Sequence, residues 1–268
     1  MPDGGRLAGK AAVVVGAGQT AGATIGNGRA TALRFAAEGA RLVLVDRDEA
    51  SVTETADLVR SEGGRAEVLV VDIAADDGGE RVATGSARLL GRIDVLHHNV
   101  GIGLGDATPT RVSDDSWERI IDVNLTAMWR TCKHVVPVMR EQQAGAIVCV
   151  SSIAAVAAAG NLTAYKVSKA GVNALVHALA TTNAKHGIRV NGIMPGLIDT
   201  PMGVDAAAAA RGMSRDDLAA ARARSVPLGR QGTAWDVANA ALFLASDEAA
   251  FITGVMLPVD GGQIAMIG

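Results

Sequence analysis

The sequence predicts an α/β protein built on a doubly wound, seven-stranded parallel sheet with helices on both faces. Three observations predict it. Short runs of β-branched and aliphatic residues alternate with helix-patterned stretches along the chain. These runs are continuously apolar, as expected for strands covered on both faces. The first run is followed by a glycine-rich loop. We therefore expect residues 1–268 to form one domain with right-handed crossovers.

Each element is read from its own residues. Strands are predicted at AAVVV (11–15), RLVLV (41–45), AEVLVV (66–71), IDVLHH (93–98), AIVCV (146–150), IRVNGI (188–193) and GVMLPV (254–259). Helices are predicted between them over about 29–39, 48–62, 76–90, 114–142, 163–185 and 234–246. The irregular stretch 197–226 is long for a loop, so we expect a substrate lid with short helices. Within it, Ser214 followed by Asp217 resembles the capping box that opens a helix.

Composition excludes several classes of protein. The chain has 268 residues, 49% hydrophobic and 20% charged, so a large core is expected. A net charge of −3 argues against binding to nucleic acid. Two cysteines exclude a disulfide scaffold, and no cluster has zinc-ligand spacing, so no metal is expected. With no apolar stretch of about 20 residues and no signal peptide, we expect a cytoplasmic protein that does not bind membranes.

The glycine-rich loop predicts a dinucleotide site. It follows the first strand and opens the first helix, where backbone N–H groups and the helix dipole face an anion. A merely flexible loop is the alternative. The residues expected to bind the phosphates are Gly16, Gly18, Gly26, Asn27 and Gly28, and Gly22 could share that role.

Asp46 ends the second strand, where a carboxylate can accept hydrogen bonds from the adenosine ribose hydroxyls and repel a 2′-phosphate. This favours NAD over NADP. The adjacent Arg47 could pair with such a phosphate, so NADP stays open. Asp46 could equally cap the helix that follows.

Tyr165 and Lys169 form the candidate catalytic pair. They are four residues apart at the start of a helix and so share one face. An ammonium beside a phenol lowers the pKa of the phenol, as a general acid/base for alcohol oxidation requires. Ser152 ends a strand and could hydrogen-bond the substrate oxygen. A solvated helix face is the alternative for the pair alone.

With these features the chain resembles the short-chain dehydrogenase/reductase family, a Rossmann-fold family, over nearly its whole length. It also carries HNVG (98–101), VNLT (123–126), RVNGIMPGLIDTPM (189–202) and ITGVMLPVDGG (252–262). The resemblance implies that Tyr165 is the acid/base, that Lys169 binds the nicotinamide ribose, that Ser152 rather than Ser151 polarises the substrate carbonyl, and that Asn124 holds a water linked to Lys169. It implies further cofactor contacts at Asp72, Ile73, Asn99, Gly101, Pro195, Gly196, Ile198 and Thr200, with Asn99 and Gly101 on the adenosine side. A homotetramer is expected.

Two departures from the family stand out. Val15 replaces the usual threonine before the first glycine. Ten positions separate Gly16 from Gly26, where about four are usual, because residues 19–24 are inserted. We hypothesise that this insertion folds over the cofactor phosphates or ribose. A harmless surface extension is the alternative.

The sequence therefore favours an NAD-dependent oxidoreductase that interconverts an uncharged, hydrophobic secondary alcohol and its ketone. An NADPH-dependent 3-oxoacyl-carrier reductase is the close alternative. A non-catalytic NAD-sensing module is an alternative of another class, which the presence of Tyr165 and Lys169 disfavours. His97 and His98 are expected to be structural, hydrogen-bonded histidines.

Overall fold

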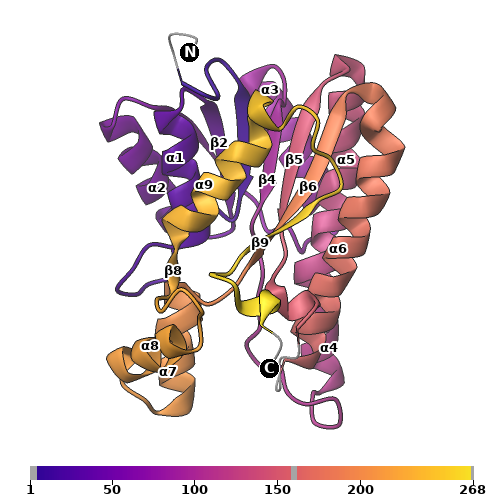
Figure 1. Cartoon of the computed structure of the whole chain (residues 1–268). Helices are drawn as coiled ribbons and strands as arrows, with labels where there is room; N and C mark the ends of the chain where they lie inside the picture. Colours follow the sequence, from indigo (N-terminus) through magenta and orange to yellow (C-terminus); the bar gives the residue numbers. More distant parts are fainter. Residues whose placement is uncertain (1–4, 158–161, 267–268) are drawn as a thin grey trace.

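The computed structural model describes residues 5–157 and 162–266 and contains the predicted seven-stranded sheet (Figure 1). All its strand pairs are parallel, in the order β3-β2-β1-β4-β5-β6-β9. The strands are β1 (Ala11–Val15), β2 (Arg41–Asp46), β3 (Arg65–Val70), β4 (Val95–His98), β5 (Gly145–Val150), β6 (Ile188–Pro195) and β9 (Met256–Val259). The order reverses between β1 and β4, which is where open α/β sheets bind their ligands.

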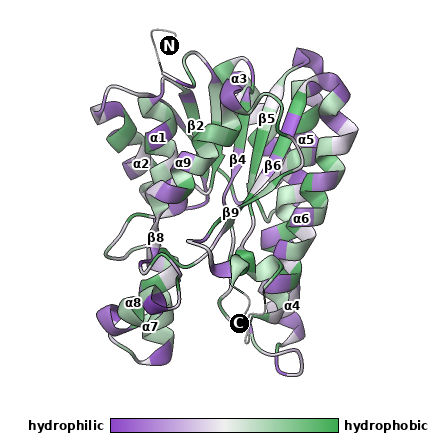
Figure 2. Ribbon diagram, in the orientation of Figure 1, coloured by the Kyte–Doolittle hydropathy of each residue, from purple (hydrophilic) through white to green (hydrophobic). Residues whose placement is uncertain are grey.

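Helices cover both faces of the sheet, as predicted (Figure 1). They are α1 (Asn27–Ala37), α2 (Glu49–Ser61), α3 (Gly78–Leu90), α4 (Asp114–Ile121), α5 (Ala127–Gln142), α6 (Thr163–Asn183), α7 (Ala206–Arg211), α8 (Arg215–Arg224) and α9 (Ala234–Ala245). One apolar cluster joins the sheet to α1, α2 and α9, and the other joins it to α3, α5 and α6. The strands are accordingly apolar and the outer helix faces mixed (Figure 2). No helix in the described parts of the chain is long and apolar enough to cross a membrane.

The long helix predicted over 114–142 is interrupted. A π-helical turn, η1 (Asp122–Thr126), separates α4 from α5. Such turns insert one extra residue into a helix and are frequent at functional sites. The sequence pattern does not reveal the turn, because apolar residues keep helical spacing on both sides of it.

The 197–226 segment contains the short helices that we expected, together with a small sheet that we did not. The strand β7 (Ile198–Asp199) leads into a π-helical turn, η4 (Pro201–Asp205), and then into α7 and α8. β7 pairs with β8 (Gly232–Thr233), which follows the segment and leads into α9. Ser214 caps α8 by accepting the Asp217 N–H at 3.1 Å. In Figure 1 α7 and α8 lie beyond the sheet, beside the loop that precedes α1.

Candidate active site

Tyr165 and Lys169 share one face of α6, as the spacing predicts. The Lys169 side chain is almost fully buried, and its Nζ donates a hydrogen bond to the Val150 carbonyl at 2.9 Å. That ammonium lies 5.7 Å from the centre of the Tyr165 ring. The end of β5 therefore positions the lysine beside the phenol.

The pKa values of this pair differ from our expectation. Burial raises the pKa of the Tyr165 phenol above its usual value, and the nearby Ser152 hydroxyl only opposes that shift. Burial also lowers the pKa of Lys169 to about 8. The expected lowering of the phenol pKa by Lys169 is thus wrong, because desolvation dominates and the ammonium donates its hydrogen bond to the Val150 carbonyl.

The two serines after β5 have different surroundings. The Ser151 hydroxyl is buried and donates to the Lys169 carbonyl at 3.0 Å and to Asn173 Oδ1 at 2.6 Å. Ser152 caps the short helix η2 (Ile153–Ala155) through a 3.1 Å bond from the Ala154 N–H, and it is the serine that acts on the Tyr165 phenol. This arrangement supports Ser152 over Ser151 as the residue facing a substrate.

Asn124 lies in the π-helical turn η1 and is fully buried. Its Oδ1 accepts the Ile102 N–H at 2.7 Å, and its Nδ2 donates to the Ile102 carbonyl and to Ser168 Oγ. A Cβ at Gly101 would lie 3.0 Å from Lys169 Nζ and 3.7 Å from Asn124 Oδ1. Gly101 therefore lies against Lys169 of α6, whereas we expected it on the adenosine side.

Asp106 is a site residue that the sequence analysis missed. The first turn of α6 has no side-chain cap of its own. Instead, the Asp106 carboxylate accepts the N–H groups of Ala164 at 3.1 Å and Tyr165 at 2.8 Å. No local pattern could reveal this cap, because Asp106 and Tyr165 are far apart in the chain.

The glycine loop forms a cradle between β1 and α1. A Cβ at Gly28 would lie 1.8 Å from the Gly16 carbonyl oxygen, so that position has room only for glycine. Gly16 has a φ of +80°, which also favours glycine. The Oδ1 of Asn27, the first residue of α1, is buried without a hydrogen-bond partner among the described residues. A close-approach cradle at a helix N-terminus, where backbone N–H groups are free to donate, fits the phosphates of a dinucleotide.

Asp46 faces this cradle. Its Oδ2 accepts the Gly18 N–H at 2.9 Å, and its Oδ1 accepts the Asp48 N–H at 3.2 Å. Asp48, rather than Asp46, caps α2 by accepting the Ser51 N–H. The carboxylate expected at the ribose is therefore free of the capping role, and Arg47 beside it is exposed.

The remaining predicted cofactor residues lie at the ends of neighbouring strands. The Asn99 amide donates to the Gly16 carbonyl at 3.3 Å, while Asp72 is exposed and Ile73 is buried. Across the sheet, Thr200 Oγ1 caps η4 by accepting the Gly203 N–H at 3.1 Å. Pro195 ends β6, Gly196 follows it, and Ile198 lies in β7, so all three shortly precede Thr200 in the chain.

Comparisons with known proteins place this geometry in a family. Residues 22–263 match the family model described as enoyl-(acyl carrier protein) reductase. The chain is 35% identical over 259 residues to 3-oxoacyl-[acyl-carrier-protein] reductase FabG of Thermotoga maritima, covering 97% of this chain and 99% of that protein. The chain is a short-chain dehydrogenase/reductase. It is accordingly an NAD(P)-dependent oxidoreductase acting on CH–OH or ketone groups.

Other members of the short-chain dehydrogenase/reductase family are equally similar. Cis-4-hydroxycyclohexanecarboxylate dehydrogenase of Sinomonas cyclohexanicum is 37% identical over 245 residues, which cover 91% of this chain and 95% of that protein. The crystal structure of carveol dehydrogenase from Mycobacterium avium in complex with NAD has a TM-score of 0.89 and 32% identity, and the match covers 98% of this chain and 100% of that one.

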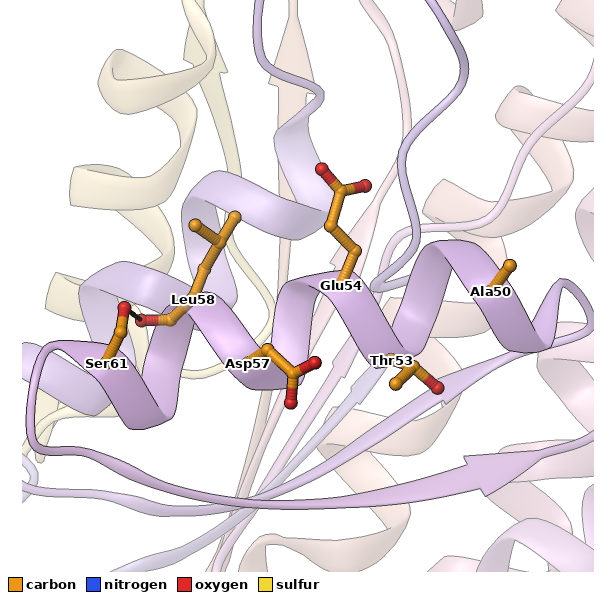
Figure 3. Close-up of a pocket in the computed structure, with 6 residues that line it drawn as sticks. All are labelled: Ala50, Thr53, Glu54, Asp57, Leu58 and Ser61. Carbon is orange, nitrogen blue, oxygen red and sulfur yellow. Dashed lines mark hydrogen bonds between the residues drawn. The ribbon is translucent and has the colours of Figure 1, made fainter.

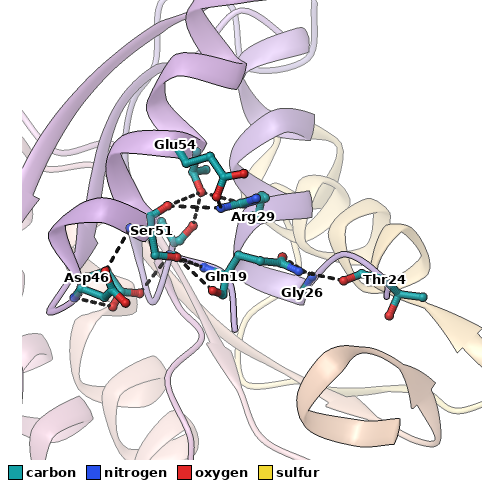
Figure 4. Close-up of polar contacts among 11 residues, drawn as sticks. Gln19, Thr24, Gly26, Arg29, Asp46, Ser51 and Glu54 are labelled. Carbon is teal, nitrogen blue, oxygen red and sulfur yellow. Dashed lines mark hydrogen bonds and ion pairs between the residues drawn. The ribbon is translucent and has the colours of Figure 1, made fainter. Parts of the chain in front are cut away.

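This short-chain dehydrogenase/reductase braces its enlarged glycine loop internally (Figure 4). The Gln19 side chain donates to the Thr24 carbonyl at 2.7 Å and accepts the Gly26 N–H at 2.8 Å. The Gln19 backbone bonds Ser51 Oγ through both its N–H and its carbonyl. The insertion is therefore a closed, tethered loop, and no loop-tying threonine is needed where Val15 stands.

Two further features lie apart from this site. The shallow depression on α2 in Figure 3 is lined by Ala50, Thr53, Glu54, Asp57, Leu58 and Ser61, on the outer face of that helix. None of the predicted site residues lines it. Within residues 5–157 and 162–266, no group of three or more His, Cys, Asp or Glu side chains could hold a metal ion.

Proposed function

We propose that this enzyme uses NAD to interconvert an uncharged, hydrophobic secondary alcohol and its ketone. The observation that carries the proposal is the convergence of Ser152, Tyr165 and Lys169 at the sheet edge where Asp46 faces the glycine cradle. The bound nicotinamide takes up or supplies the hydride. The protein's own residues then have to move a proton and polarise an oxygen.

The roles of these residues follow from their surroundings. Tyr165 donates its phenolic proton to a ketone oxygen or takes one from an alcohol, while the Ser152 hydroxyl stabilises charge on that oxygen. Lys169 would hold the nicotinamide ribose hydroxyls. Asn124 fixes the Ile102 backbone and the π-helical turn, and so shapes the wall beside Lys169.

The remaining cofactor contacts are proposed along the crevice. Asp46 accepts the adenosine ribose hydroxyls, and the Gly16–Gly28 cradle faces the phosphates. Further contacts are proposed for Asp72, Ile73, Asn99, Pro195, Gly196, Ile198 and Thr200.

The apolar character of the substrate is supported by the flanks of the site. Leu104, Leu162 and Met202 are large hydrophobic side chains that remain exposed beside the segments carrying Tyr165 and Thr200. Exposed apolar side chains gathered at a site suit an apolar ligand. The likeness to carveol dehydrogenase further supports a cyclic secondary alcohol. We propose that the 197–226 segment is the lid over this substrate.

The second candidate is an NADPH-dependent 3-oxoacyl-carrier reductase. The relative of that name and the exposed Arg47, which could pair with a 2′-phosphate, both support it.

We also propose a homotetramer, because Trp117 on α4, Trp129 on α5 and Val167 on α6 are exposed apolar side chains. Light scattering would contradict that assembly if it found a monomer.

The deciding experiment measures NADH formation on a panel of cyclic, steroid, sugar and β-hydroxyacyl alcohols, with NADP⁺ in parallel. Turnover with NAD⁺ should fall at least about a hundredfold in Tyr165→Phe, since only the transferable proton is lost. Calorimetry should show NAD⁺ binding unchanged in that variant. Near-normal turnover in Tyr165→Phe would overturn the acid/base role, and turnover with NADPH on 3-oxoacyl substrates alone would favour the second candidate.

A further inference from the structure

The insertion in the glycine loop meets the 197–226 segment directly. A Cβ on Gly22 would lie 2.6 Å from the Pro201 Cβ and 3.1 Å from the Asp205 Cγ, so the Gly22 backbone lies directly against these two side chains. The Ala23 N–H donates to Asp205 Oδ1 at 3.2 Å, and Thr24 Oγ1 donates to Asp199 Oδ1 at 3.3 Å. The insertion thus packs on η4 and on the end of β7.

One arginine links the same two carboxylates to the lid helix. Arg215, in the first turn of α8, pairs through its guanidinium with Asp199 and lies 3.5 Å from Asp205 Oδ1. The side chains of all three residues are about one-quarter exposed, so water screens these pairs less than it does surface pairs. Asp199 therefore accepts hydrogen bonds from the insertion and from α8, whereas Asp205 accepts one from the insertion and is ion-paired with α8.

These contacts connect the two ends of the cofactor crevice. Gln19 ties the insertion to Gly26, and the neighbouring Gly18 bonds Asp46 at the adenosine end (Figure 4). Asp199 stands between Ile198 and Thr200 at the expected nicotinamide end. A displacement of the lid must therefore strain the insertion, and a displacement of the insertion must strain the lid.

We propose that Asp199, Asp205 and Arg215 are positioning residues that lock the substrate lid to the inserted cofactor loop, so that the two order together. The insertion, which we expected to fold over the phosphates, serves as the docking surface of the lid. The lid role rests on the proposed function, but the coupling between the two segments does not.

Backbone hydrogen exchange of the cofactor-free protein tests the coupling. Arg215→Gln removes both ion pairs, and Thr24→Val removes one hydroxyl while keeping the side-chain shape. Each should speed exchange about fivefold both in residues 19–26 and in residues 206–224, the order expected when one partly buried pair or hydrogen bond is lost. The decisive signature is the effect of each change on the segment that it does not touch.

Matched controls exist in both segments. Arg224 is an exposed arginine on the same helix α8, and Thr20 is an exposed threonine in the same insertion. Neither side chain makes a hydrogen bond or ion pair within the described residues. Arg224→Gln and Thr20→Val should leave both segments unchanged. Faster exchange confined to the mutated segment, or none in either, would overturn the proposal. Gly22→Ala, which forces Pro201 away, gives an independent variant that keeps every charge.

Cofactor titration then separates this inference from the proposed function. NAD⁺ binding, followed by tryptophan fluorescence, should weaken about fivefold in Arg215→Gln although Arg215 belongs to the lid. Thr24→Val combined with Arg215→Gln should weaken it less than the product of the single effects. If the wild-type protein binds neither NAD⁺ nor NADP⁺, the proposed function fails while the exchange result still decides the coupling. If the wild-type protein binds NAD⁺ but each substitution changes hydrogen exchange only in its own segment, the proposed coupling fails and the proposed function stands.

Discussion

The Asp106 carboxylate accepts the backbone N–H of Tyr165 at 2.8 Å, across 59 positions of the chain. The same carboxylate accepts the Ala164 N–H, so it occupies the N-terminus of α6, the helix that carries the proposed acid/base. The loop around it is anchored at Ile102 by Asn124, and Gly103 approaches the Tyr165 ring. Asp106 thereby fixes both the phenol and one wall of the site.

Asp106→Ala should lower turnover about ten- to a hundredfold, because the phenol loses its fixed position while no cofactor contact is removed. The dissociation constant for NAD⁺ should stay within about twofold. The turnover of Asp106→Asn, which keeps one acceptor oxygen, should lie between that of the wild type and that of Asp106→Ala. Thr233→Ala is the control, since Thr233 caps α9, a helix without predicted site residues, by accepting the Asp236 N–H. Equal kinetic losses in both alanine variants would mean that Asp106 acts only on stability.

Asp46→Asn should weaken NAD⁺ binding about tenfold and bring the dissociation constants for NAD⁺ and NADP⁺ closer together. The reason is that the amide accepts fewer hydrogen bonds from ribose and no longer repels a 2′-phosphate. Asp48→Asn removes a carboxylate two residues away that caps α2 instead. Calorimetric titration should show that this control keeps the NAD⁺ preference, and an unchanged preference in Asp46→Asn would assign cofactor choice elsewhere.

His97 and His98 make the fold sensitive to acid. Both rings are fully buried, and neither has a hydrogen-bond partner among the described residues, so the expected structural hydrogen bonds are absent there. Burial lowers the pKa of each to about 3, and the Lys169 charge adds to that lowering for His98. The unfolded chain binds protons below pH 6.5 that the fold does not. Stability is therefore retained above about pH 6.5 and is lost as the pH falls toward 3.

His98→Asn should remove one of the two histidine contributions to the loss of stability at low pH. Urea unfolding at pH 6.5 and pH 5 should show that the variant loses about 2 kcal/mol less than the wild type over that interval. His177→Asn replaces an exposed histidine on α6 and should behave like the wild type. Parallel losses in His98→Asn and the wild type would mean that His98 is protonated in the fold.

The buried Lys169 ammonium should change the stability of the fold at alkaline pH rather than at acidic pH. Its folded pKa of about 8 lies below the ordinary value of 10.5, because the cation is buried. Between these values the unfolded chain binds the extra proton, so stability rises with pH from about 8 to 10.5. Lys169→Met should lack this rise, by about 1.4 kcal/mol per pH unit. Unfolding curves at pH 8 and 9.5 measure it, and identical slopes would place the ammonium in water.

The strands were the most predictable part of the fold. Every predicted strand of the main sheet overlaps an observed one, because continuous apolar runs have no other stable place in an α/β protein. The starts of α2 at Asp48 and of α8 at Ser214 were equally predictable from the local sequence, because an N-cap side chain bonds the first turn of its own helix. The π-helical turn at Asn124 was not predictable, because the residue bonds Ile102 and Ser168, which belong to other segments of the chain.

The candidate site also has parts that the sequence predicts and parts that it does not. Tyr165, Lys169 and the glycines of the cradle follow from spacing along one helix or one loop. Asp106 and the contacts of Arg215 depend on which loops the sheet brings together, and no short-range pattern records that. The pKa of Tyr165 was misjudged for a related reason: its burial depends on packing from several segments, whereas its distance from Lys169 depends on one helix.

The phenol at the centre of the site belongs to the only tyrosine in the chain. Any spectroscopic signal specific to tyrosine therefore comes from the Tyr165 side chain alone, without overlap from other tyrosines. The ultraviolet absorption of the phenolate, or a single resonance after labelling with carbon-13 tyrosine, reports the protonation of Tyr165 directly. The unaltered enzyme thus carries a single spectroscopic probe at the position where we propose that the proton moves.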